Sequence, residues 1–563
     1  MRTFVAVVLA AAAFVQPDGI AAESSMPVQA THGMVVTEQR YATQAGVDVL
    51  RAGGNAVDAA VAAAYALAVV DPCCGNLGGG GFMLVRMHDG PEHFIDFRER
   101  APQRASARMY LDASGNVIPD ASTRGYLAAG VPGTVMGLER ALKEYGTRSR
   151  AFVMARAIAL AAHGFRVGPG DAAIFQALNG ISDPGVRRIF FSNGLPPRAG
   201  DVLVQTQLAR TLSEIAAGGP AVFYDGPVAR AIVAASSAHG GILSLDDFRT
   251  YTAEERDPVH CAYRGYVITS APPPSSGGTT LCEILGITAA FPLRAWGAGS
   301  VRSAHYVAEA ERRAYADRNA YLGDPDYVRN PIAQLLSPQY QARLRSTISA
   351  DRATPSSRVH PGLGPPPEGT DTTHFSVVDR WGNAVAVTYT INDDFGAGVI
   401  AGDTGFFLND EMDDFTSKPG VPNLYGLVQG ERNAIRPGKR PLSSMAPTIV
   451  TRNGKLFMVT GSPGGSRIIT IVLSTLENVI DYGMNVQQAV DAPRMHMQYL
   501  PDRIEYEPGA FDARTMRALR AQGYALRRVS SWGSAQAILV DSRTGALTGG
   551  SDRRRPGGAA IGY

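Results

Sequence analysis

The chain contains 563 residues, of which 45% are hydrophobic and 18% are charged, and its formal net charge at pH 7 is +2. This composition predicts a folded globular protein and excludes an intrinsically disordered one. The near-neutral charge gives no support to nucleic acid or an anionic membrane as a partner. Glycine is enriched at 62 residues, which indicates many places where backbone packs closely against backbone or ligand.

The N-terminus predicts an export signal. Arg2 supplies a positive charge, residues 5–15 form an apolar run, and Ala21-Ala22 are small residues suited to cleavage. Because the run is too short for a membrane anchor, we predict a signal peptide over residues 1–22 and a periplasmic or secreted protein. A buried first helix is the alternative. No later stretch is long and apolar enough for a membrane span, and residues 59–70 predict a buried core helix.

Hydrophobic periodicity and the positions of glycine and proline predict the remaining elements in chain order. The predicted elements are two helices within 37–70 broken at Gly53-Gly54, strands at 82–86 and 94–97, mainly helix over 134–253, an amphipathic helix over 304–321, a linker or flexible loop over 351–370, and strands at 375–378, 384–391 and 457–460.

The strand over 384–391 has two chemically different faces. Because side chains alternate along a strand, one face carries the apolar residues and is expected in a core. The other face carries Thr388, Thr390 and Asn392 and can line a site. An odd loop between this strand and the preceding one would set Thr372 opposite Thr390 or Asn392, whereas an even loop would set Thr373 there.

Four cysteines are present, at positions 73, 74, 261 and 282, and an exported compartment permits disulfides. A bridge between Cys73 and Cys74 would join neighbouring residues and be strained. One long-range bridge or four buried thiols are the alternatives. The sequence has no Cys-x-x-Cys motif and no Cys/His ligand cluster, so it predicts no metal site.

Thr372 has the most specific chemistry in the chain. A threonine within a chain is an inert alcohol, but one released as a new N-terminus carries an amine that titrates near neutral pH and can accept the hydroxyl proton. The Pro/Gly-rich segment 360–369 precedes Thr372-Thr373 at the edge of an apolar strand. The sequence therefore suggests self-cleavage and an N-terminal nucleophile hydrolase, with an ordinary strand-edge threonine as the alternative.

Eight segments together resemble the γ-glutamyltransferase (glutathione hydrolase) family. Residues 372–379, Thr-Thr-His-Phe-Ser-Val-Val-Asp, resemble the start of its small subunit. Each motif is weak alone, but their order is specific, and the resemblance covers essentially everything after the leader. The other matching segments are 53–60, 75–82, 96–99, 272–278, 409–415, 441–447 and 461–467.

The resemblance implies a mixed α/β (α+β) fold, the four-layer αββα sandwich of N-terminal nucleophile hydrolases. It implies cleavage between Asp371 and Thr372 into a large subunit, residues 23–371, and a small catalytic subunit, residues 372–563, which form the sandwich jointly. It implies no metal and no organic cofactor.

The resemblance also assigns the catalytic residues. Thr372 would be the nucleophile and Thr390 would orient it. Gly464 and Gly465 would supply oxyanion donors, because glycines let backbone N–H groups face a site without a Cβ in the way. A tight turn is the alternative for these two glycines.

A γ-glutamyl donor also carries an α-carboxylate and an α-amine. The carboxylate calls for a bidentate cation, which the resemblance identifies as Arg98, and the amine calls for acceptors. Surface charges are the alternative for the charged residues. The hydroxyl donors would be Ser443 and Ser444, the amine acceptors Asn392, Glu411 and Asp414, and Tyr425 within 422–430 would belong to a lid loop.

The implied reaction passes the γ-glutamyl group of glutathione or a similar compound through Thr372 to water or to the amine of an amino acid or peptide. One rival is a β-lactam acylase that cleaves glutaryl-type amides, against which Asp414 argues because it would then face nothing. A second rival is a non-catalytic exported binding protein. Many bacterial members of the family carry Gln at the position of Glu411. The negative charges of Glu411 and of the acidic pair Asp393-Asp394 favour a cationic amine and bear on acceptor preference.

Overall fold

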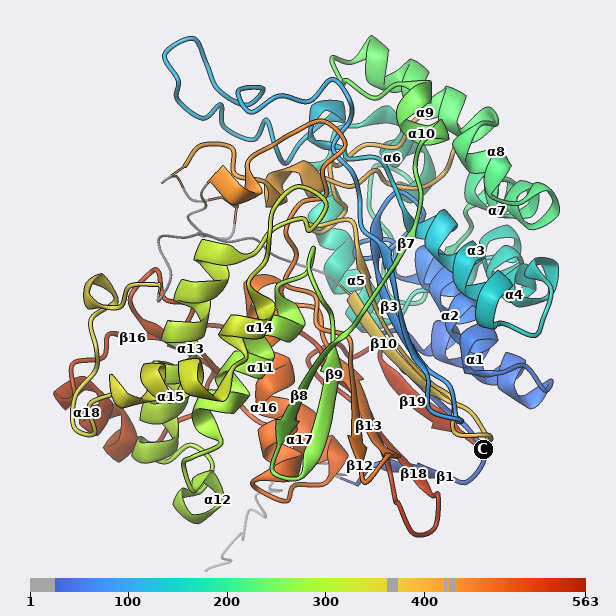
Figure 1. Ribbon diagram of the computed structural model, residues 1–563. Coiled ribbons are helices and arrows are strands. Elements are labelled where there is room, and N and C mark those ends of the chain that lie inside the picture. Colours follow the sequence, from blue (N-terminus) through green and yellow to red (C-terminus); the bar gives the residue numbers. More distant parts are fainter. Residues whose placement is uncertain (1–25, 362–372, 420, 422, 425–430) are drawn as a thin grey trace, which may run out of the picture.

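The computed structural model describes residues 26–361, 373–419, 421, 423–424 and 431–563 (Figure 1). The predicted leader and the residues after it up to 25, residues 362–370 of the predicted linker, the predicted cleavage site at Asp371 and Thr372, and the predicted lid residue Tyr425 lie outside the described residues. Within the described ranges, no helix is both long and apolar enough to cross a membrane.

Two antiparallel sheets of seven strands form the centre of the molecule, and helices cover the outer face of each (Figure 1). This is the four-layer αββα sandwich that the resemblance predicted. The first sheet has the order β19 (Ala559–Gly562), β2 (Met34–Thr37), β10 (Thr373–Val378), β11 (Ala384–Thr390), β3 (Gly80–Arg86), β4 (Glu92–Phe97) and β7 (Glu254–Arg256). The second has the order β1 (Val28–Ala30), β18 (Leu547–Ser551), β17 (Gln536–Val540), β13 (Lys455–Gly461), β12 (Thr448–Arg452), β9 (Tyr266–Ser270) and β8 (Val259–Tyr263).

Each sheet combines strands from both sides of the predicted cleavage site. In the first sheet β10 pairs with β2 and β11 pairs with β3. In the second sheet β12 pairs with β9 and β18 pairs with β1. The two halves of the chain therefore build the fold jointly, as predicted.

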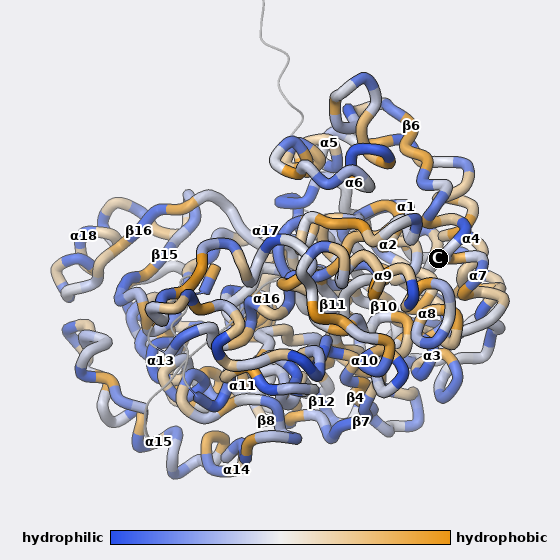
Figure 2. The backbone as a smooth tube through the Cα atoms, turned by 90° about the horizontal axis from the view of Figure 1, so that it is seen from above, coloured by the Kyte–Doolittle hydropathy of each residue, from blue (hydrophilic) through white to orange (hydrophobic). Residues whose placement is uncertain are grey.

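The helix pair predicted within 37–70 is confirmed as α1 (Arg40–Arg51) and α2 (Ala56–Val70). Asn55 begins α2 with a capping box: its side chain accepts from the Asp58 N–H at 3.0 Å, and Asp58 accepts from the Asn55 N–H at 2.8 Å. Every residue of α2 is buried, so this helix fills the core against the first sheet. Hydrophobic segments gather around α2, β10 and β11 in Figure 2.

The helical region predicted over 134–253 is confirmed, and it extends the layer over the first sheet. Its main helices are α3 (Thr134–Tyr145), α4 (Arg150–His163), α7 (Thr206–Gly218) and α9 (Pro227–Ala238). The opposite layer covers the second sheet and consists mainly of α11 (Gly277–Thr288), α13 (Val301–Tyr321) and α16 (Ile468–Ile480).

The β10–β11 hairpin settles the register question for the described residues. Val378 pairs with Ala384, so the loop between them holds an odd number of residues, and Thr373 pairs with Tyr389. The face that carries Tyr389 packs against α2, where the Tyr389 hydroxyl donates to Ala64 O at 3.0 Å. Thr373 shares that core-side face, with its Cγ2 against Gly75. Thr373 therefore does not lie opposite Thr390.

The opposite face of β11 was predicted to line a site, and for Thr388 that prediction is wrong. Thr388 lies between the two sheets and contacts His374 Nδ1 at 2.8 Å. His374 Nε2 lies 3.1 Å from Ser376 Oγ, which donates to Gln536 O of the second sheet. Burial lowers the pKa of His374 to about 3, so this histidine is neutral and ties the sheets together.

The predicted helix over 304–321 is confirmed as α13, but its amphipathic character is not. Residues on all its faces are buried, including the charged ones. The charges are tolerated because they are paired within the protein: Arg313 Nη1 lies 2.7 Å from Glu309 Oε2, and Arg312 contacts Asp502. A charged helix face in the sequence thus marks an internal polar network.

All four cysteines form disulfides. Cys261 pairs with Cys282 over a sequence separation of 21, and Cys73 pairs with its neighbour Cys74. The structure therefore contains both the vicinal bridge and a longer one. It contradicts the alternative of four buried thiols.

Candidate active site

A cavity of about 330 Å³ opens where β11 ends and the turn after β13 begins. Two predicted site residues, Asn392 and Gly464, line it. The wall also contains residues that the sequence did not single out, namely Glu38, Cys74, Trp532, Arg554 and Arg555. The cavity is polar and strongly charged, as suits a charged ligand.

The end of β11 presents Thr390 and Asn392 in one tight turn. The Asn392 N–H donates to Thr390 Oγ1 at 2.7 Å, and Asn392 has a φ of +77°. The Asn392 Nδ2 donates to both Asp410 O and Asp410 Oδ2, at 3.1 and 3.2 Å. Among the described residues, Asn392 Oδ1 is buried without a hydrogen-bond partner. A buried acceptor of this kind is costly unless a ligand satisfies it, so Asn392 can accept from a bound amine.

Gly464 and Gly465 form the turn between β13 and α16, and both adopt backbone conformations that favour glycine. Their φ values are +133° and +63°, a region that L side chains rarely adopt. Gly464 lines the cavity, whereas Gly465 is absent from the described wall. The turn leads directly into α16, so its N–H groups lie at the positive end of a helix. Its geometry is compatible with the predicted oxyanion role.

Arg98 lies in a fully buried cluster of carboxylates. Its Nη1 contacts Glu411 and its Nη2 contacts Asp414, while Glu99 lies 3.6 Å away. The Arg98 Nε donates to Pro441 O at 3.2 Å. The alternative interpretation of these residues as surface charges is wrong, and the structure brings the predicted cation and two predicted acceptors into direct contact.

The electrostatics of this cluster follow from burial. Burial alone lowers the pKa of Arg98, but Glu411, Asp414 and Glu99 more than offset it, so the net pKa is raised and Arg98 stays charged. Burial raises the pKa of Glu411 well above its usual range, against the opposing effect of Arg98. Burial also raises the pKa of Glu99 to about 7. One cation thus faces three carboxyl groups, of which some hold protons near neutral pH.

Ser443 and Ser444 lie where the segment after Pro441 meets α11. The Ser444 Oγ accepts from Arg318 Nη2 at 3.0 Å, and Arg318 Nε donates to Ser276 Oγ at 2.9 Å. The Ser443 Oγ accepts from the Met445 N–H at 3.1 Å. Arg318, on α13, therefore holds Ser444 and Ser276 together.

The predicted residues form one continuous region through short links. Asn392 contacts Asp410, which directly precedes Glu411. Asn409 then ties this segment to the glycine-rich chain before β3, because its Nδ2 donates to Gly78 O at 2.7 Å. The Arg98 bond to Pro441 O joins the carboxylate cluster to the segment that carries the two serines. The site thus uses both halves of the chain.

Comparison with known proteins identifies the family. The sequence model of the family described as Gamma-glutamyltranspeptidase matches residues 42–562. The chain belongs to the γ-glutamyltranspeptidase family. It is 50% identical to the glutathione hydrolase proenzyme of Pseudomonas sp. (strain A14), with all of both chains covered, and 47% identical to that of Escherichia coli (strain K12), covering 97% of this chain and 94% of the relative.

A solved structure from the same superfamily matches the whole fold. The crystal structure of a cephalosporin acylase from Bacillus halodurans superimposes with a TM-score of 0.85 at 29% identity, covering 98% of this chain and 99% of that one. The protein is therefore an enzyme of the N-terminal nucleophile hydrolase fold.

Three residues of this candidate site were not identified from the sequence. Asp410, the partner of Asn392, lies inside the matched segment 409–415, so the motif itself could have indicated it. Arg318 lies in a charged helix that was expected to face solvent. Arg555 comes near the C-terminus in an arginine run that carries no local signal, and only the fold brings it to the cavity wall.

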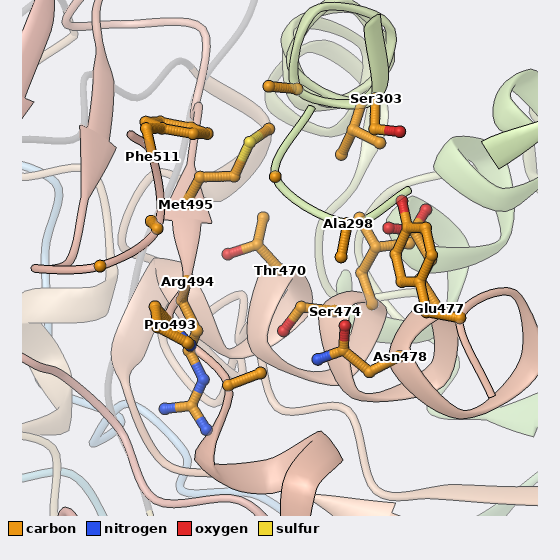
Figure 3. Close-up of a pocket in the computed structure, with 18 of the residues that line it drawn as sticks. Ala298, Ser303, Thr470, Ser474, Glu477, Asn478, Pro493, Arg494, Met495 and Phe511 are labelled. Carbon is orange, nitrogen blue, oxygen red and sulfur yellow. The ribbon is translucent and has the colours of Figure 1, made fainter. Parts of the chain in front are cut away.

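A second cavity, of about 190 Å³, lies between α13 and α16 and contains none of the predicted site residues (Figure 3). Thr470, Ser474 and Asn478 on α16 line it. Glu311 and Glu477 also line it, and burial raises the pKa of Glu477 to about 8. Burial also raises the pKa of Glu311, so the neutral form of both carboxyl groups is favoured, and Arg494 supplies a cation in the same wall.

Proposed function

We propose that the protein is a self-cleaving glutathione hydrolase that attacks the γ-glutamyl amide with Thr372 and transfers the γ-glutamyl group to water or to the amine of an amino acid or peptide. The proposal includes cleavage between Asp371 and Thr372 into subunits of residues 23–371 and 372–563. The export signal at residues 1–22 supports a periplasmic or secreted location.

The observation that carries the proposal is the contact of Arg98 with Glu411 and Asp414. A γ-glutamyl group ends in an α-carboxylate and an α-amine on one carbon. A buried guanidinium with carboxylates beside it is complementary to such a zwitterion. A glutaryl group has a carboxylate but no amine, so it would bring a further negative charge to the cluster without the positive charge that complements Glu411 and Asp414.

The β10–β11 register supports Thr372 as the nucleophile. Thr373 pairs with Tyr389, so the same register extended by one residue would set Thr372 opposite Thr390, on the face away from α2. From the sequence, an odd loop was expected to set Thr372, and not Thr373, opposite Thr390.

In the proposed reaction the Thr372 hydroxyl attacks the γ-carbonyl carbon and its proton passes to the Thr372 amine. The N–H groups of Gly464 and Gly465 stabilise the resulting oxyanion. When the C–N bond breaks, the departing amine takes up the proton and leaves as cysteinylglycine. Water or an acceptor amine then attacks the ester and frees Thr372.

The substitution Asp414→Asn distinguishes this proposal from the acylase alternative, which the likeness to a cephalosporin acylase keeps open. If Asp414 binds the α-amine, loss of its charge lowers kcat/KM for γ-glutamyl-p-nitroanilide roughly tenfold to hundredfold, as for a charge-assisted hydrogen bond. Turnover of glutaryl-p-nitroanilide should change far less. Equal losses on both substrates would overturn the donor assignment.

Asp413→Asn is the matched control. Asp413 is the neighbouring buried carboxylate, but it accepts from Ser122 Oγ at 2.7 Å and lies outside the Arg98 contacts. The ratio of the two activities should stay at its wild-type value in this variant.

The denatured intact mass tests the nucleophile and the binding-protein alternative. Wild-type protein should yield two species, with the smaller beginning at Thr372, and Thr372→Ala should remain a single chain. A smaller species beginning at Thr373 would move the nucleophile by one residue. A single wild-type chain that stays intact on long incubation would favour the non-catalytic binding protein.

A further inference from the structure

The vicinal disulfide Cys73–Cys74 lies in the wall of the cavity of about 330 Å³ described above. Cys74 is half-buried and lines the cavity together with Asn392 and Gly464, whereas Cys73 is buried behind it. A molecule in the cavity can therefore reach the Cys74 sulfur. Cys261–Cys282 differs, since it lies outside the described wall of this cavity and Cys282 is fully buried.

The two bridges also differ in what they contribute to the fold. A disulfide stabilises mainly by constraining the unfolded chain, and this effect grows slowly with the length of chain that it closes. Cys261–Cys282 closes a separation of 21 residues, but Cys73–Cys74 joins adjacent residues. Opening the vicinal bridge therefore frees almost no additional chain in the unfolded state, so the chain-entropy argument gives it almost no structural role.

The backbone of the cysteine pair holds the turn that carries Asn392. The Ile391 N–H donates to Cys74 O at 3.1 Å, and the Phe395 N–H donates to Cys73 O at 2.8 Å. Asn392 and Phe395 both have positive φ, at +77° and +65°. Such conformations persist only where the surroundings hold them, and these two hydrogen bonds lie on either side of the acidic turn.

The Arg555 guanidinium lies directly against the pair. Its Nη2 is 2.9 Å from Cys74 Sγ and 3.5 Å from Cys73 Sγ, and it also contacts Asp71 at 3.2 Å. This cation favours a thiolate over a thiol, whereas Asp71 Oδ1, 3.3 Å from Cys73 Sγ, and Asp394 Oδ1, 3.8 Å from Cys74 Sγ, act in the opposite direction. Arg555 also lies 3.2 Å from Glu38, so nearby carboxylates hold the cation in place whether the sulfurs are joined or separate.

We propose that Cys73–Cys74 is a thiol-exchange site that reacts with small cysteinyl thiols in the cavity that it lines. A thiolate attacks Cys74 Sγ, the Cys73–Cys74 bond breaks, and Cys73 leaves as a thiolate that takes up a proton. A second thiolate attacks the small-molecule sulfur of the mixed disulfide, which releases the Cys74 thiolate. Two thiols are thereby oxidised to one disulfide and the protein pair is reduced to two thiols.

The exchange itself does not depend on the proposed function, but its kinetic consequence rests on the proposed role of Asn392. Opening the bridge loosens the carbonyls that hold residues 391 and 395. Reduced enzyme should therefore bind the γ-glutamyl donor more weakly, with KM raised about threefold to tenfold, as for the loss of one neutral hydrogen bond. The proposed function, in contrast, predicts an effect of Asp414→Asn with the bridge intact.

The test uses mature full-length protein, cysteinylglycine as the thiol, serylglycine as the thiol-free control, and iodoacetamide labelling of the native protein followed by peptide mass spectrometry. With increasing cysteinylglycine, the peptide containing residues 73 and 74 should gain label or a mixed disulfide before Cys261–Cys282 opens. Labelling of both pairs together, or of the first pair only after denaturation, would overturn the proposal.

The kinetic arm compares two double variants. In Cys73→Ala/Cys74→Ala the thiol-dependent rise in KM should vanish, whatever the starting KM. In Cys261→Ala/Cys282→Ala the rise should persist. If the wild-type pair exchanges but KM stays constant, the exchange site stands and the coupling through Asn392 is overturned.

Discussion

The substitution Gly464→Ala tests the oxyanion assignment where the backbone is most constrained. The φ of Gly464 is +133°, and holding an L-residue in such a conformation costs about 1–3 kcal/mol. The added Cβ would also lie 2.7 Å from Ile471 Cδ1, but the end of a flexible side chain can move away. The alanine would therefore relax mainly by a change in φ, which rotates the peptide between residues 463 and 464 and with it the Gly464 N–H.

Such a rotation would turn a proposed donor away from the oxyanion. Loss of one oxyanion donor lowers kcat by about 10²–10³-fold, or roughly 3–4 kcal/mol of transition-state stabilisation. This exceeds the strain in the folded protein. We therefore expect a fall in kcat of at least about 100-fold, with a much smaller change in KM and a modest loss of thermal stability.

The assay is hydrolysis of γ-glutamyl-p-nitroanilide, expressed per cleaved enzyme from the denatured intact mass so that defective self-cleavage is not counted as lost turnover. Gly454→Ala is the matched control, because Gly454 has a φ of +74° and open space around its Cβ position. The control should lose about 1–2 kcal/mol of stability and keep its kcat. If Gly464→Ala retains the kcat of this control, the oxyanion assignment is wrong.

Three further substitutions test other parts of the site and the fold. Arg318→Lys loses the two-pronged contact to Ser276 and Ser444, so kcat/KM should fall about tenfold, mainly through KM; an unchanged KM would remove Ser444 from donor binding. His374→Gln should make stability less sensitive to acid. The pKa of His374 is about 3 in the folded protein and about 6.5 in the unfolded chain. Above pH 6.5 the histidine is neutral in both states, so its titration does not change the free energy of unfolding. Between pH 6.5 and 3 the unfolded chain binds a proton that the folded protein does not, so the free energy of unfolding falls as the pH falls. In denaturant titrations the wild type should lose about 2 kcal/mol more than His374→Gln between pH 7.5 and 5; parallel curves would refute this. Glu411→Gln should bind the donor at least as tightly as the wild type, measured as KM. Loss of a charge-assisted contact would instead raise KM about tenfold or more, and that result would make Glu411 an essential acceptor.

Local sequence patterns were sufficient for the elements that one segment determines. The glycine pair at 53–54 and the apolar run after it predicted the break between α1 and α2 and the buried helix. Strand alternation predicted which face of β11 meets the core. These features depend on neighbouring residues only, so a single segment contains the necessary information.

Contacts between distant segments could not be predicted in the same way. The charges of α13 looked like a solvent-facing stripe, since nothing near them in sequence indicates the partners that bury them. The sequence left open whether the loop between β10 and β11 is odd or even, and only the paired strands fix it. Arg555 reaches the cavity from near the C-terminus, and Cys74 reaches it from near the N-terminus. Such residues belong to the site only through the tertiary fold.

In the Arg98 cluster, the residues that pair with one another in the folded protein are the same ones that are proposed to bind the substrate. Buried ion clusters add little stability in themselves, because removing charges from water costs about as much as their pairing returns. In this cluster both ends of the Arg98 guanidinium contact a carboxylate, so a substrate carboxylate must displace one of them. Glu411 is the easier to displace, because burial already favours its protonated, neutral form. Asp414 can then stay in contact with Arg98 beside the incoming amine, so the site exchanges one internal carboxyl group for that of the substrate and keeps Arg98 paired throughout.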